Sequence, residues 1–388
     1  MDFKIPDELK QIQMLVRRFV REELQPLEQL VEERDEFPEE LRKPLINRSI
    51  ELGIRNMAVP ERYGGGGLGV LAQVLASEES GWTSEAITQG LLLGGDGGTL
   101  DVASEKQRQQ YFLPSLRGDK ELCSAWTEPD AGGDAAGIKT HAVKEGNGWV
   151  INGTKHFSTN ADRAQFFIVG AVTNATSRKS DRFTQFIVDR ETAGFSIGAY
   201  QPMMGRHGLH SYELVFQECY VPDENVLGEV GGGLRNQLAG FGAGRLLMGA
   251  RMIGTADRAL EMSLEQAKRR QTFGQLLATR QAVQWMLVDM SIDIHATRMM
   301  TYHAAWEIEQ GIGARARQSR QAMIKLFATN MACRALDNAI QIHGGMGYSR
   351  MLPLERMYRD IRLFRIAEGP DEMMRHVIAR ELLQMQLS

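Results

Sequence analysis

The chain has 388 residues, of which 43% are hydrophobic and 24% charged, so its composition is that of an ordinary globular protein with a large core. Its net charge of -4 gives no general attraction to nucleic acid or to an anionic membrane surface. It contains no apolar run near the roughly 20 residues that span a bilayer, and its first residues lack the basic and apolar parts of a signal peptide. We expect a cytoplasmic protein of bacterial type with no nucleic-acid or membrane partner, with a processed organellar form left open.

Residues 1–122 predict an N-terminal helical domain. Apolar side chains at positions 12, 15, 16, 19 and 20 follow the spacing of one helix face. Glycine-rich stretches at 64–67 and 94–98 interrupt these helices. Neither stretch has the spacing of a dinucleotide-binding or P-loop motif, so we interpret both as connecting loops in which backbones approach closely.

Residues 123–230 predict a β domain. The segment 149–157 combines apolar residues with Asn152-Gly153, a pair that tolerates the positive φ of a tight turn, so it predicts a hairpin turning at these two residues. Further strands are predicted at 166–169, 186–188 and 212–220.

Residues 231–388 predict a second helical region. Met323, Phe327, Met331 and Ala335 recur at every fourth position, and the segment 245–310 contains few helix-breaking residues. Long apolar helices of this kind usually pack in a bundle. The order is therefore helical, β, helical, which is an α+β fold that is mostly α.

The three cysteines are scattered along the chain and form no CxxC pair. Cys123, Cys219 and Cys333 are therefore predicted to be reduced thiols in the core. We expect no metal site.

Four separated segments together resemble the acyl-CoA dehydrogenase family. They are WTEPDAGGD at 126–134, RQTFG at 270–274, QIHGGMGY at 341–348, and YRD at 358–360 leading to EG at 368–369. The lesser motifs YGG at 63–65 and VPDENVLG at 221–228 also look like the family. The resemblance extends over essentially the whole chain. It implies a middle β-barrel or sandwich, a C-terminal four-helix bundle, an acyl-CoA substrate and FAD as cofactor.

Glu368 is the candidate base. As a residue pattern alone, a glutamate before a glycine is more often a solvated cap or surface residue. Leu363, Phe364, Ile366 and Ala367 precede it, however, and an apolar surround raises the pKa of a carboxyl toward a value useful for proton abstraction. The resemblance implies that Glu368 removes the α-proton of the thioester, that its N–H helps to hold the thioester carbonyl, and that N5 of FAD takes the β-hydride to give the trans-2-enoyl-CoA.

The resemblance also assigns residues to the two ligands. The expected FAD contacts are Trp126, Thr127, Gly133, Phe157, Ser158, Thr159, Arg270, Thr272, Phe273, Gln281, Gln341, Gly344, Gly345, Pro370 and Glu372. The expected substrate contacts are Gly133, Gly242, Arg245, Ala367 and Gly369. By residue type alone, Trp126 and Phe157 also fit sheet core, Gly344-Gly345 a helix stop, and Arg245 a surface ion pair.

Three positions depart from the family pattern in the parts that hold the cofactor and the base. Gly133 stands where a serine is usual, which keeps a backbone contact and loses a hydroxyl. Phe157 stands where many relatives carry tryptophan, which keeps an apolar wall and removes an indole N–H. Some relatives carry the catalytic carboxylate at the position of Gly244, which cannot act as a base, so Glu368 is the matched candidate.

Three further departures lie beside Glu368. Ala367 stands where several straight-chain enzymes carry tyrosine, so we expect a wider pocket that favours branched, cyclic or long acyl groups. Pro370 and Glu372 differ from the more common pattern of Thr and Gln or Glu. Because Pro370 has neither an N–H nor a hydroxyl, any flavin contact there must differ.

The resemblance implies partners as well. In similar enzymes the C-terminal cofactor residues reach an FAD held mainly by a neighbouring subunit, which implies a homotetramer built as a dimer of dimers. An electron-transferring flavoprotein is the expected acceptor. An acyl-CoA oxidase, a flavin monooxygenase on the same scaffold, and a catalytically silent helical scaffold stay open as alternatives.

Overall fold

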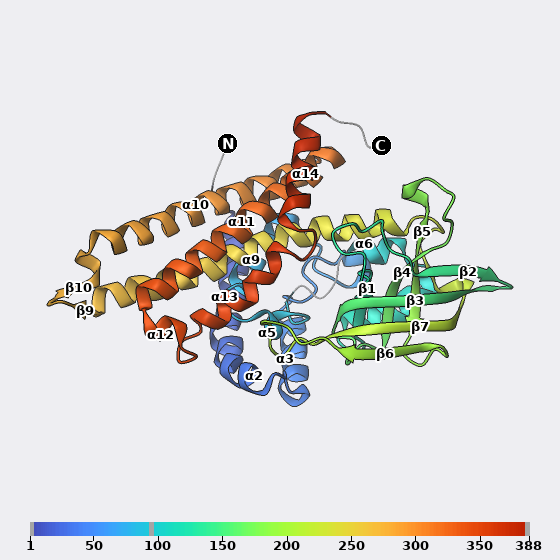
Figure 1. Cartoon of the computed structure of the whole chain (residues 1–388), viewed down its shortest axis with the longest axis horizontal. Coiled ribbons are helices and arrows are strands. Elements are labelled where there is room, and N and C mark those ends of the chain that lie inside the picture. Colours follow the sequence, from blue (N-terminus) through green and yellow to red (C-terminus); the bar gives the residue numbers. More distant parts are fainter. Residues whose placement is uncertain (1–3, 93–96, 385–388) are drawn as a thin grey trace.

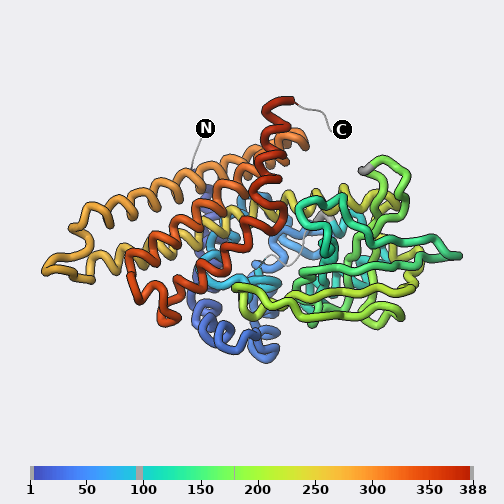
Figure 2. The backbone as a smooth tube through the Cα atoms, viewed as in Figure 1, coloured from blue at the N-terminus to red at the C-terminus, as the bar shows by residue number. Residues whose placement is uncertain are grey.

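The structure, a computed structural model, describes residues 4–92 and 97–384. It has a helical N-terminal part, a β domain and a C-terminal set of long helices, in that order (Figure 1). Figure 2 shows the N-terminal helices lying where the long helices meet the β domain. The predicted fold class is confirmed.

The N-terminal helices form because their apolar residues share one face. Val16 and, in the π-helical stretch Phe19–Leu24 that continues the first helix, Phe19 and Val20 are buried, which confirms the predicted face. The helices are α1 (Asp7–Arg18), α2 (Glu28–Arg34), α3 (Glu39–Glu51), α4 (Val70–Ser80), α5 (Glu85–Thr88), α6 (Gly97–Val102), α7 (Glu105–Gln107) and α8 (Leu113–Leu116).

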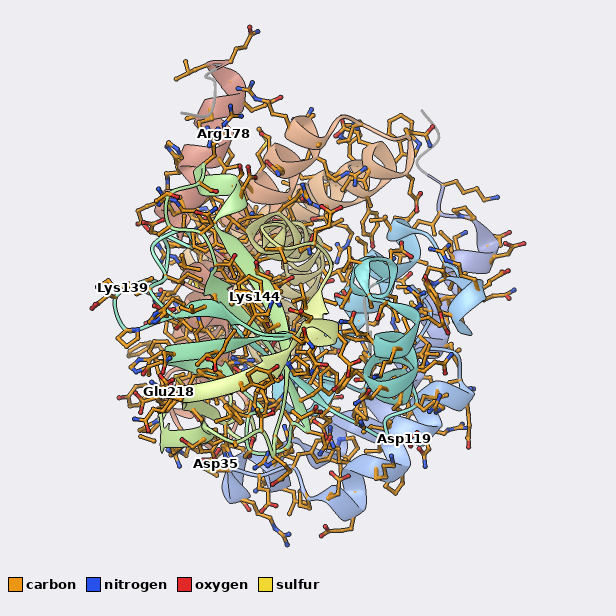
Figure 3. The ribbon with its side chains drawn as sticks, turned by 90° about the vertical axis from the view of Figure 1, so that its right-hand side faces the viewer. Asp35, Asp119, Lys139, Lys144, Arg178 and Glu218 are labelled. Atoms are coloured by element: carbon orange, nitrogen blue, oxygen red, sulfur yellow. The ribbon has the colours of Figure 1, made fainter. Side chains whose placement is uncertain are left out.

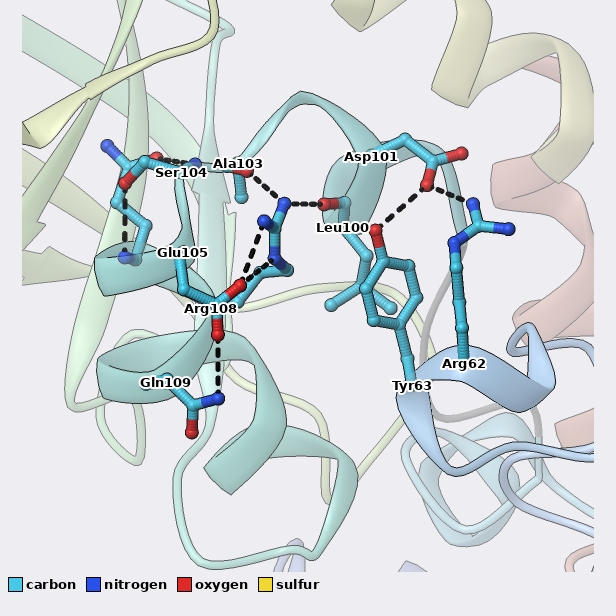
Figure 4. A network of polar contacts seen from close by, with 10 residues as sticks. Arg62, Tyr63, Leu100, Asp101, Ala103, Ser104, Glu105, Arg108 and Gln109 are labelled. Carbon is cyan, nitrogen blue, oxygen red and sulfur yellow. Dashed lines mark hydrogen bonds and ion pairs between the residues drawn. The ribbon is translucent and has the colours of Figure 1, made fainter.

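The glycine stretch 64–67 is a connecting loop, as predicted. A Cβ on Gly65 would lie 2.1 Å from the Val59 carbonyl oxygen, so the two backbones touch there. Figure 4 shows how the preceding residues are anchored: Tyr63 and Arg62 both donate hydrogen bonds to the Asp101 carboxylate. The second stretch, 94–98, lies mostly outside the described residues.

The β domain is one sheet that folds over itself. Its strand order is β6-β7-β3-β2-β4-β5-β8, and β1 pairs with β4 in parallel. The ring of Phe195 on β6 lies 4.6 Å from that of Phe167 on β4, although the two strands are far apart in the sheet. The two halves therefore face each other, as a barrel or sandwich requires. The strands are β1 (Leu122–Ala125), β2 (His141–Glu145), β3 (Gly148–Thr159), β4 (Phe166–Val172), β5 (Phe183–Asp189), β6 (Phe195–Tyr200), β7 (Ser211–Pro222) and β8 (Val226–Leu227).

Strand β4 is buried on both faces, which explains its continuous apolar sequence. Phe167 and Val169 pack in the interior of the β domain. Phe166, on the other face, packs against Tyr111 and Phe112 of the N-terminal helical part. Because side chains alternate along a strand, one face of β4 packs within the β domain and the other packs against the N-terminal helical part.

The predicted hairpin turn at Asn152-Gly153 is wrong. Strand β3 runs through both residues, and the turn from β2 to β3 lies at residues 146–147, where Gly146 has the positive φ. Asn152 instead forms an irregularity in the pairing with β7, where its side chain exchanges two 2.8 Å hydrogen bonds with Glu218. Glu218 itself has a φ of 50° and lies on the outer surface of the domain (Figure 3). The Asn-Gly pair therefore forms a β-bulge within a strand instead of a turn between two strands.

Three long helices dominate the C-terminal part: α9 (Gly233–Arg269), α10 (Gln281–Glu309) and α11 (Ala314–His343). Shorter helices on α11 complete the bundle, with a break between α13 and α14. Helix α11 contains the four residues whose spacing predicted a helix, which confirms that prediction; Met331 and Ala335 are buried and Phe327 is 36% exposed. The remaining elements are β9 (Gln271–Thr272), β10 (Gln275–Leu276), α12 (Gly345–Tyr348), α13 (Leu354–Arg362) and α14 (Asp371–Leu382).

The cysteines and the helices fit the expectations from composition. Cys123, Cys219 and Cys333 are buried and unpaired. Within residues 4–92 and 97–384, no helix is long and apolar enough to cross a membrane.

Candidate active site

Glu368 lies in the break between α13 and α14. After α13 the chain makes a 3-10 turn at Leu363–Arg365, and α14 begins at Asp371. Between them Glu368 has a φ of 54° and Gly369 a φ of 100°. A non-glycine residue in this left-handed region costs on the order of 1–3 kcal/mol, so the surrounding structure must hold it there.

Two buried cations hold the backbone of this loop. Arg245 on α9 donates from Nε to the Glu368 carbonyl oxygen at 2.8 Å. Lys325 on α11, which has no exposed surface, donates from Nζ to the Gly369 carbonyl oxygen at 2.7 Å. The Lys325 amine also lies 3.6 Å from the Asp371 carboxylate. Arg245 is therefore a buried support of the loop instead of a member of a surface ion pair.

The Glu368 carboxyl group lies against Gly244 of α9. A Cβ on Gly244 would lie 2.7 Å from Glu368 Oε2, so a larger residue at 244 would displace the carboxyl from this position. Oε2 is buried and has no hydrogen-bond partner among the described residues. Burial raises the pKa of Glu368 to about 7; Arg245 and Lys325 oppose this rise in pKa, and Glu85 adds to it. A carboxyl with this pKa can take up and release a proton near neutral pH.

The backbone N–H of Glu368 is the second chemical group of the loop. In the described part of the chain it donates to no backbone or side-chain acceptor, whereas Ile366 and Ala367 both donate to the Leu363 carbonyl. An N–H that points away from its own loop can hold a carbonyl oxygen of a ligand beside the carboxyl.

In the β domain, the predicted flavin contacts at 157–159 and 127 come together. Strand β3 approaches the 126–128 segment, because the His156 N–H donates to the Thr127 carbonyl at 2.8 Å. The Thr159 hydroxyl bonds to Ser211 at 3.1 Å. Phe157 has a φ of 54° and is 55% exposed. This exposed ring in a strained backbone conformation is therefore a candidate contact for a ligand.

Trp126 and Ser158 lie inside the β domain. Trp126 is 6% exposed, its indole N–H donates to the Ala135 carbonyl, and its ring fills the space beside Gly170. The core interpretation of Trp126 therefore accounts for its side chain. Ser158 is 1% exposed, and its hydroxyl oxygen has no partner among the described residues.

The residues that fix the 126–128 segment escaped prediction. Lys155 has no exposed surface, and its Nζ donates to Glu128 at 2.7 Å and to the Trp126 carbonyl at 3.1 Å. Burial lowers the pKa of Lys155 to about 8. Lys325 stands between apolar residues of α11, which was a signal in the sequence, whereas Lys155 lies between Thr154 and His156 and gives no such signal.

Two departures from the family pattern face each other. A Cβ on Gly133 would lie 3.2 Å from Cγ and 3.3 Å from Cδ of Pro370, so these residues bring the middle domain and the Glu368 loop into contact. Ala367 is partly exposed beside Glu368, and Glu372 is exposed in the first turn of α14. Gly242 faces Gln321 of α11, at 2.5 Å from a Cβ built on it, so helix packing alone accounts for that glycine.

The other predicted cofactor residues gather at the far end of the bundle. Arg270, His343 and Met346 line one cleft of about 670 Å³. Gly344 ends α11 with a φ of 61°, and a Cβ on it or on Gly345 would have nothing within 4 Å. The helix-stop interpretation therefore holds for the backbone, and these glycines also face open space. Gln281 and Gln341 are exposed, Thr272 is partly exposed, and Phe273 is 99% exposed.

The two groups of predicted cofactor residues lie far apart in one chain. Helix α9 rises about 36 Å from Arg245, beside Glu368, to Arg269 at its end. Figure 1 shows β9 and β10 at the end of the molecule opposite the β domain. A single flavin beside Glu368 cannot reach Arg270 of the same chain.

The described residues contain no group of three or more His, Cys, Asp or Glu side chains placed to hold a metal ion.

Comparison with known proteins covers nearly the whole chain. The N-terminal, middle and C-terminal domain models of acyl-CoA dehydrogenase match residues 6–119, 123–219 and 231–383. The chain is 36% identical to (R)-benzylsuccinyl-CoA dehydrogenase of Thauera aromatica over 398 residues, which cover 99% of this chain and 97% of that protein.

Solved structures agree in fold and cofactor. Butyryl-CoA dehydrogenase of Megasphaera elsdenii has a TM-score of 0.90 and 32% identity, over 99% of this chain and 100% of that one. The FAD complex of PigA has a TM-score of 0.92 and 27% identity, over 100% of both chains. The chain belongs to the acyl-CoA dehydrogenase family, whose members are oxidoreductases that act on CH–CH bonds with FAD as cofactor.

Proposed function

We propose that this enzyme dehydrogenates an acyl-CoA thioester between its α and β carbons, giving the trans-2-enoyl-CoA, with Glu368 as the base that removes the α-proton. The observation that carries the proposal is the Glu368 carboxyl itself. It is held in a strained loop, has an unpaired buried oxygen, and has its pKa raised to about 7. FAD, when bound, supplies at N5 the acceptor for the β-hydrogen and two electrons.

The residues of the chain divide the remaining work. Near neutral pH a substantial fraction of Glu368 is ionised and can accept the α-proton. Its own N–H donates to the thioester oxygen, which makes the α-proton more acidic. Arg245 and Lys325 hold the two carbonyl groups of the loop, so the base and the N–H donor keep one orientation.

The flavin ring is proposed to lie against the β-domain surface formed by Phe157, Thr127 and Thr159. The exposed Phe157 ring offers an apolar wall there. Arg270, beside the 670 Å³ cleft, and the open backbone at Gly344 and Gly345 suit the phosphates and sugar of the cofactor. Because the two groups are far apart, they would serve FAD molecules held by different subunits.

This division needs at least two copies of the chain, and the proposed assembly is a homotetramer built as a dimer of dimers. A second copy would bring its Arg270 end to the flavin of the first. The outer face of α10 offers an apolar contact surface, since Trp285, Val288 and Ile292 are 60%, 52% and 60% exposed on one side of the helix.

The acceptor of the electrons is proposed to be an electron-transferring flavoprotein. An oxidase on this scaffold would share the step at Glu368 and pass electrons to O2, and a monooxygenase would not need the base. Oxygen uptake during turnover separates these from a dehydrogenase. Rapid O2 consumption with each acyl-CoA would overturn the dehydrogenase assignment.

The test of the proposal is anaerobic titration of the FAD-loaded protein with a panel of acyl-CoA thioesters, recording bleaching of the flavin. Glu368→Gln should keep FAD and lose several orders of magnitude in bleaching rate, because the proposed base is removed. Glu191→Gln, at an exposed position after β5, is the matched control and should bleach like the parent. Parental bleaching by Glu368→Gln would place proton abstraction elsewhere.

The small Ala367 side chain beside the base carries a proposal about the acyl group. Without an aromatic ring there, branched, cyclic or long acyl groups should fit next to the α and β carbons. Values of kcat/KM for butyryl-CoA and for branched acyl-CoAs test this, and a clear preference for short straight chains would contradict it.

A further inference from the structure

A strip of α9 leads from the base to an arginine. Gly244, which touches the Glu368 carboxyl, and Arg251 are two helical turns apart and so lie on one face, about 10.5 Å apart along the axis. Long side chains on a helix point back toward its N-terminus. This tendency favours a direction toward Glu368, and the Arg251 guanidinium contacts the carbonyl of Thr83, two residues before Glu85. Apolar Leu247 and Met248 occupy the turn between them.

Arg251 lacks a carboxylate partner. In the described part of the chain, its guanidinium makes one long hydrogen bond, from Nη2 to the Thr83 carbonyl at 3.4 Å, and no Asp or Glu lies within 4.0 Å of it. It is neither fully buried nor exposed. Burial lowers the pKa of Arg251, and the charges of Glu85 and Asp360 act in the opposite direction without a direct contact. An uncompensated guanidinium inside a protein is costly, and an anion that binds it recovers that cost.

The acidic groups nearby are already engaged by another arginine. The Arg206 guanidinium lies 2.7 Å from the Glu85 carboxylate, and the Arg206 N–H donates to Asp360. Arg206 has a φ of 63°, a strained conformation that keeps both contacts in place. Burial also raises the pKa of Asp360 to about 6, which makes it a weaker anion.

Glu85 and Arg206 also connect Arg251 with the base. Both residues act electrostatically on Arg251 and on Glu368, raising or lowering the pKa of each. The four side chains thus belong to one neighbourhood. Within it, Arg251 is the cation that no carboxylate of the described residues contacts.

We propose that Arg251 binds a negatively charged group on the distal part of the acyl chain, so that the preferred substrates are CoA thioesters of dicarboxylic acids. The thioester and the α-carbon lie at Glu368, the methylene groups pass Leu247 and Met248, and the free carboxylate meets the guanidinium. This rests on the proposed role of Glu368. Arg251 would select substrates by the charge at the end of the acyl chain, whereas the small Ala367 would select them by size.

The experiment compares thioesters of equal chain length with and without a terminal carboxylate. In the Glu368→Gln background, which binds without turnover, calorimetry gives the affinities of the FAD-loaded protein for adipyl-CoA and hexanoyl-CoA. A charge-assisted hydrogen bond should favour adipyl-CoA by about tenfold or more. Glutaryl-CoA and suberyl-CoA, compared with pentanoyl-CoA and octanoyl-CoA, locate the length at which the preference is greatest. The same pairs are then compared as kcat/KM with the parental enzyme.

Substitution at 251 assigns the effect. Arg251→Met should remove the preference while leaving hexanoyl-CoA binding intact, and Arg251→Lys should keep part of it. Arg235→Met, at an exposed site of the same helix, should change neither affinity. Flavin content identifies correctly folded variants, and Arg251→Gln serves if the methionine variant does not fold.

Equal affinity for members of every pair overturns the inference, as does a folded Arg251→Met or Arg251→Gln variant that keeps the preference. Selective binding of adipyl-CoA without bleaching of the parental flavin would instead overturn the proposed role of Glu368 and support the role of Arg251.

Discussion

Adding one methyl group at Gly244 should reduce catalysis while it strengthens the helix. A Cβ at this position would lie 2.7 Å from Oε2, 3.0 Å from Oε1 and 3.1 Å from Cδ of Glu368. To restore an ordinary contact of 3.4 Å, Oε2 has to retreat by about 0.7 Å. The carboxyl cannot stay in place and accept the methyl.

The size of the effect follows from that displacement. Misplacing a reacting group by about 1 Å costs up to roughly 10²-fold in rate, so Gly244→Ala should lower kcat by about 10- to 100-fold. Replacing glycine by alanine inside a helix stabilises it by up to about 1 kcal/mol. The variant should therefore be no less stable than the parent, and a loss of activity cannot be explained by unfolding.

The assay is anaerobic bleaching of the flavin at saturating substrate, together with thermal unfolding of the FAD-loaded protein. Gly240→Ala is the matched control, because Gly240 lies on the same helix and a Cβ there would have nothing within 4 Å. It should raise stability and leave kcat unchanged. If Gly244→Ala bleaches as fast as Gly240→Ala, the Glu368 carboxyl is not where the reaction needs it.

Four other predictions concern the site and the proposed assembly. The value of kcat/KM should rise with pH through about 7 as Glu368 loses its proton, and a profile that is flat from pH 5.5 to 8.5 would contradict this role. Lys325→Met should shift this rise in kcat/KM to higher pH, because a cation that lowers the pKa of Glu368 is lost. It should also reduce kcat more than it changes KM, because the hydrogen bond to the Gly369 carbonyl is lost. Lys325→Arg should recover part of the rate. Arg270→Ala should lower the FAD content per chain, measured by absorbance. Trp285→Glu should lower the mass of the assembly, measured by light scattering. An unchanged FAD content or an unchanged mass would argue against the shared cofactor site.

The order of domains was predictable because each domain has its own periodicity. The spacing at residues 12–20 gives one apolar helix face, and those side chains are buried or pack against the core. Strand β4 was predictable from its apolar run, although the reason for the run is tertiary, since Phe166 and Phe167 face different domains. The helix that contains Phe327 was predictable from its spacing, but the exposure of that side chain was not, because the periodicity of a helix does not distinguish a core face from a surface left open in a single chain.

The hairpin failed for a related reason. Asn152-Gly153 has the residue types of a tight turn, but a β-bulge accepts the same residues. The deciding partners are distant in sequence: Glu218 lies on β7, and Thr140, which a Cβ on Gly153 would contact, directly precedes β2. The supports of the base were equally hidden, because Lys325 and Arg245 meet the Glu368 loop only after two long helices have packed together.

The structure around Glu368 explains why a base and a loop can be tuned together. Burial alone would push the pKa of this carboxyl higher, and the cations that restrain it are the same groups that hold the strained backbone. Moving either cation would therefore change both the direction of the N–H and the affinity of the carboxyl for its proton. A substitution that changed only the orientation of the Glu368 carboxyl, or only its pKa, would have to lie at a position other than these cations. Among the described residues, Gly244 suits this purpose, because it touches the carboxyl and carries no charge.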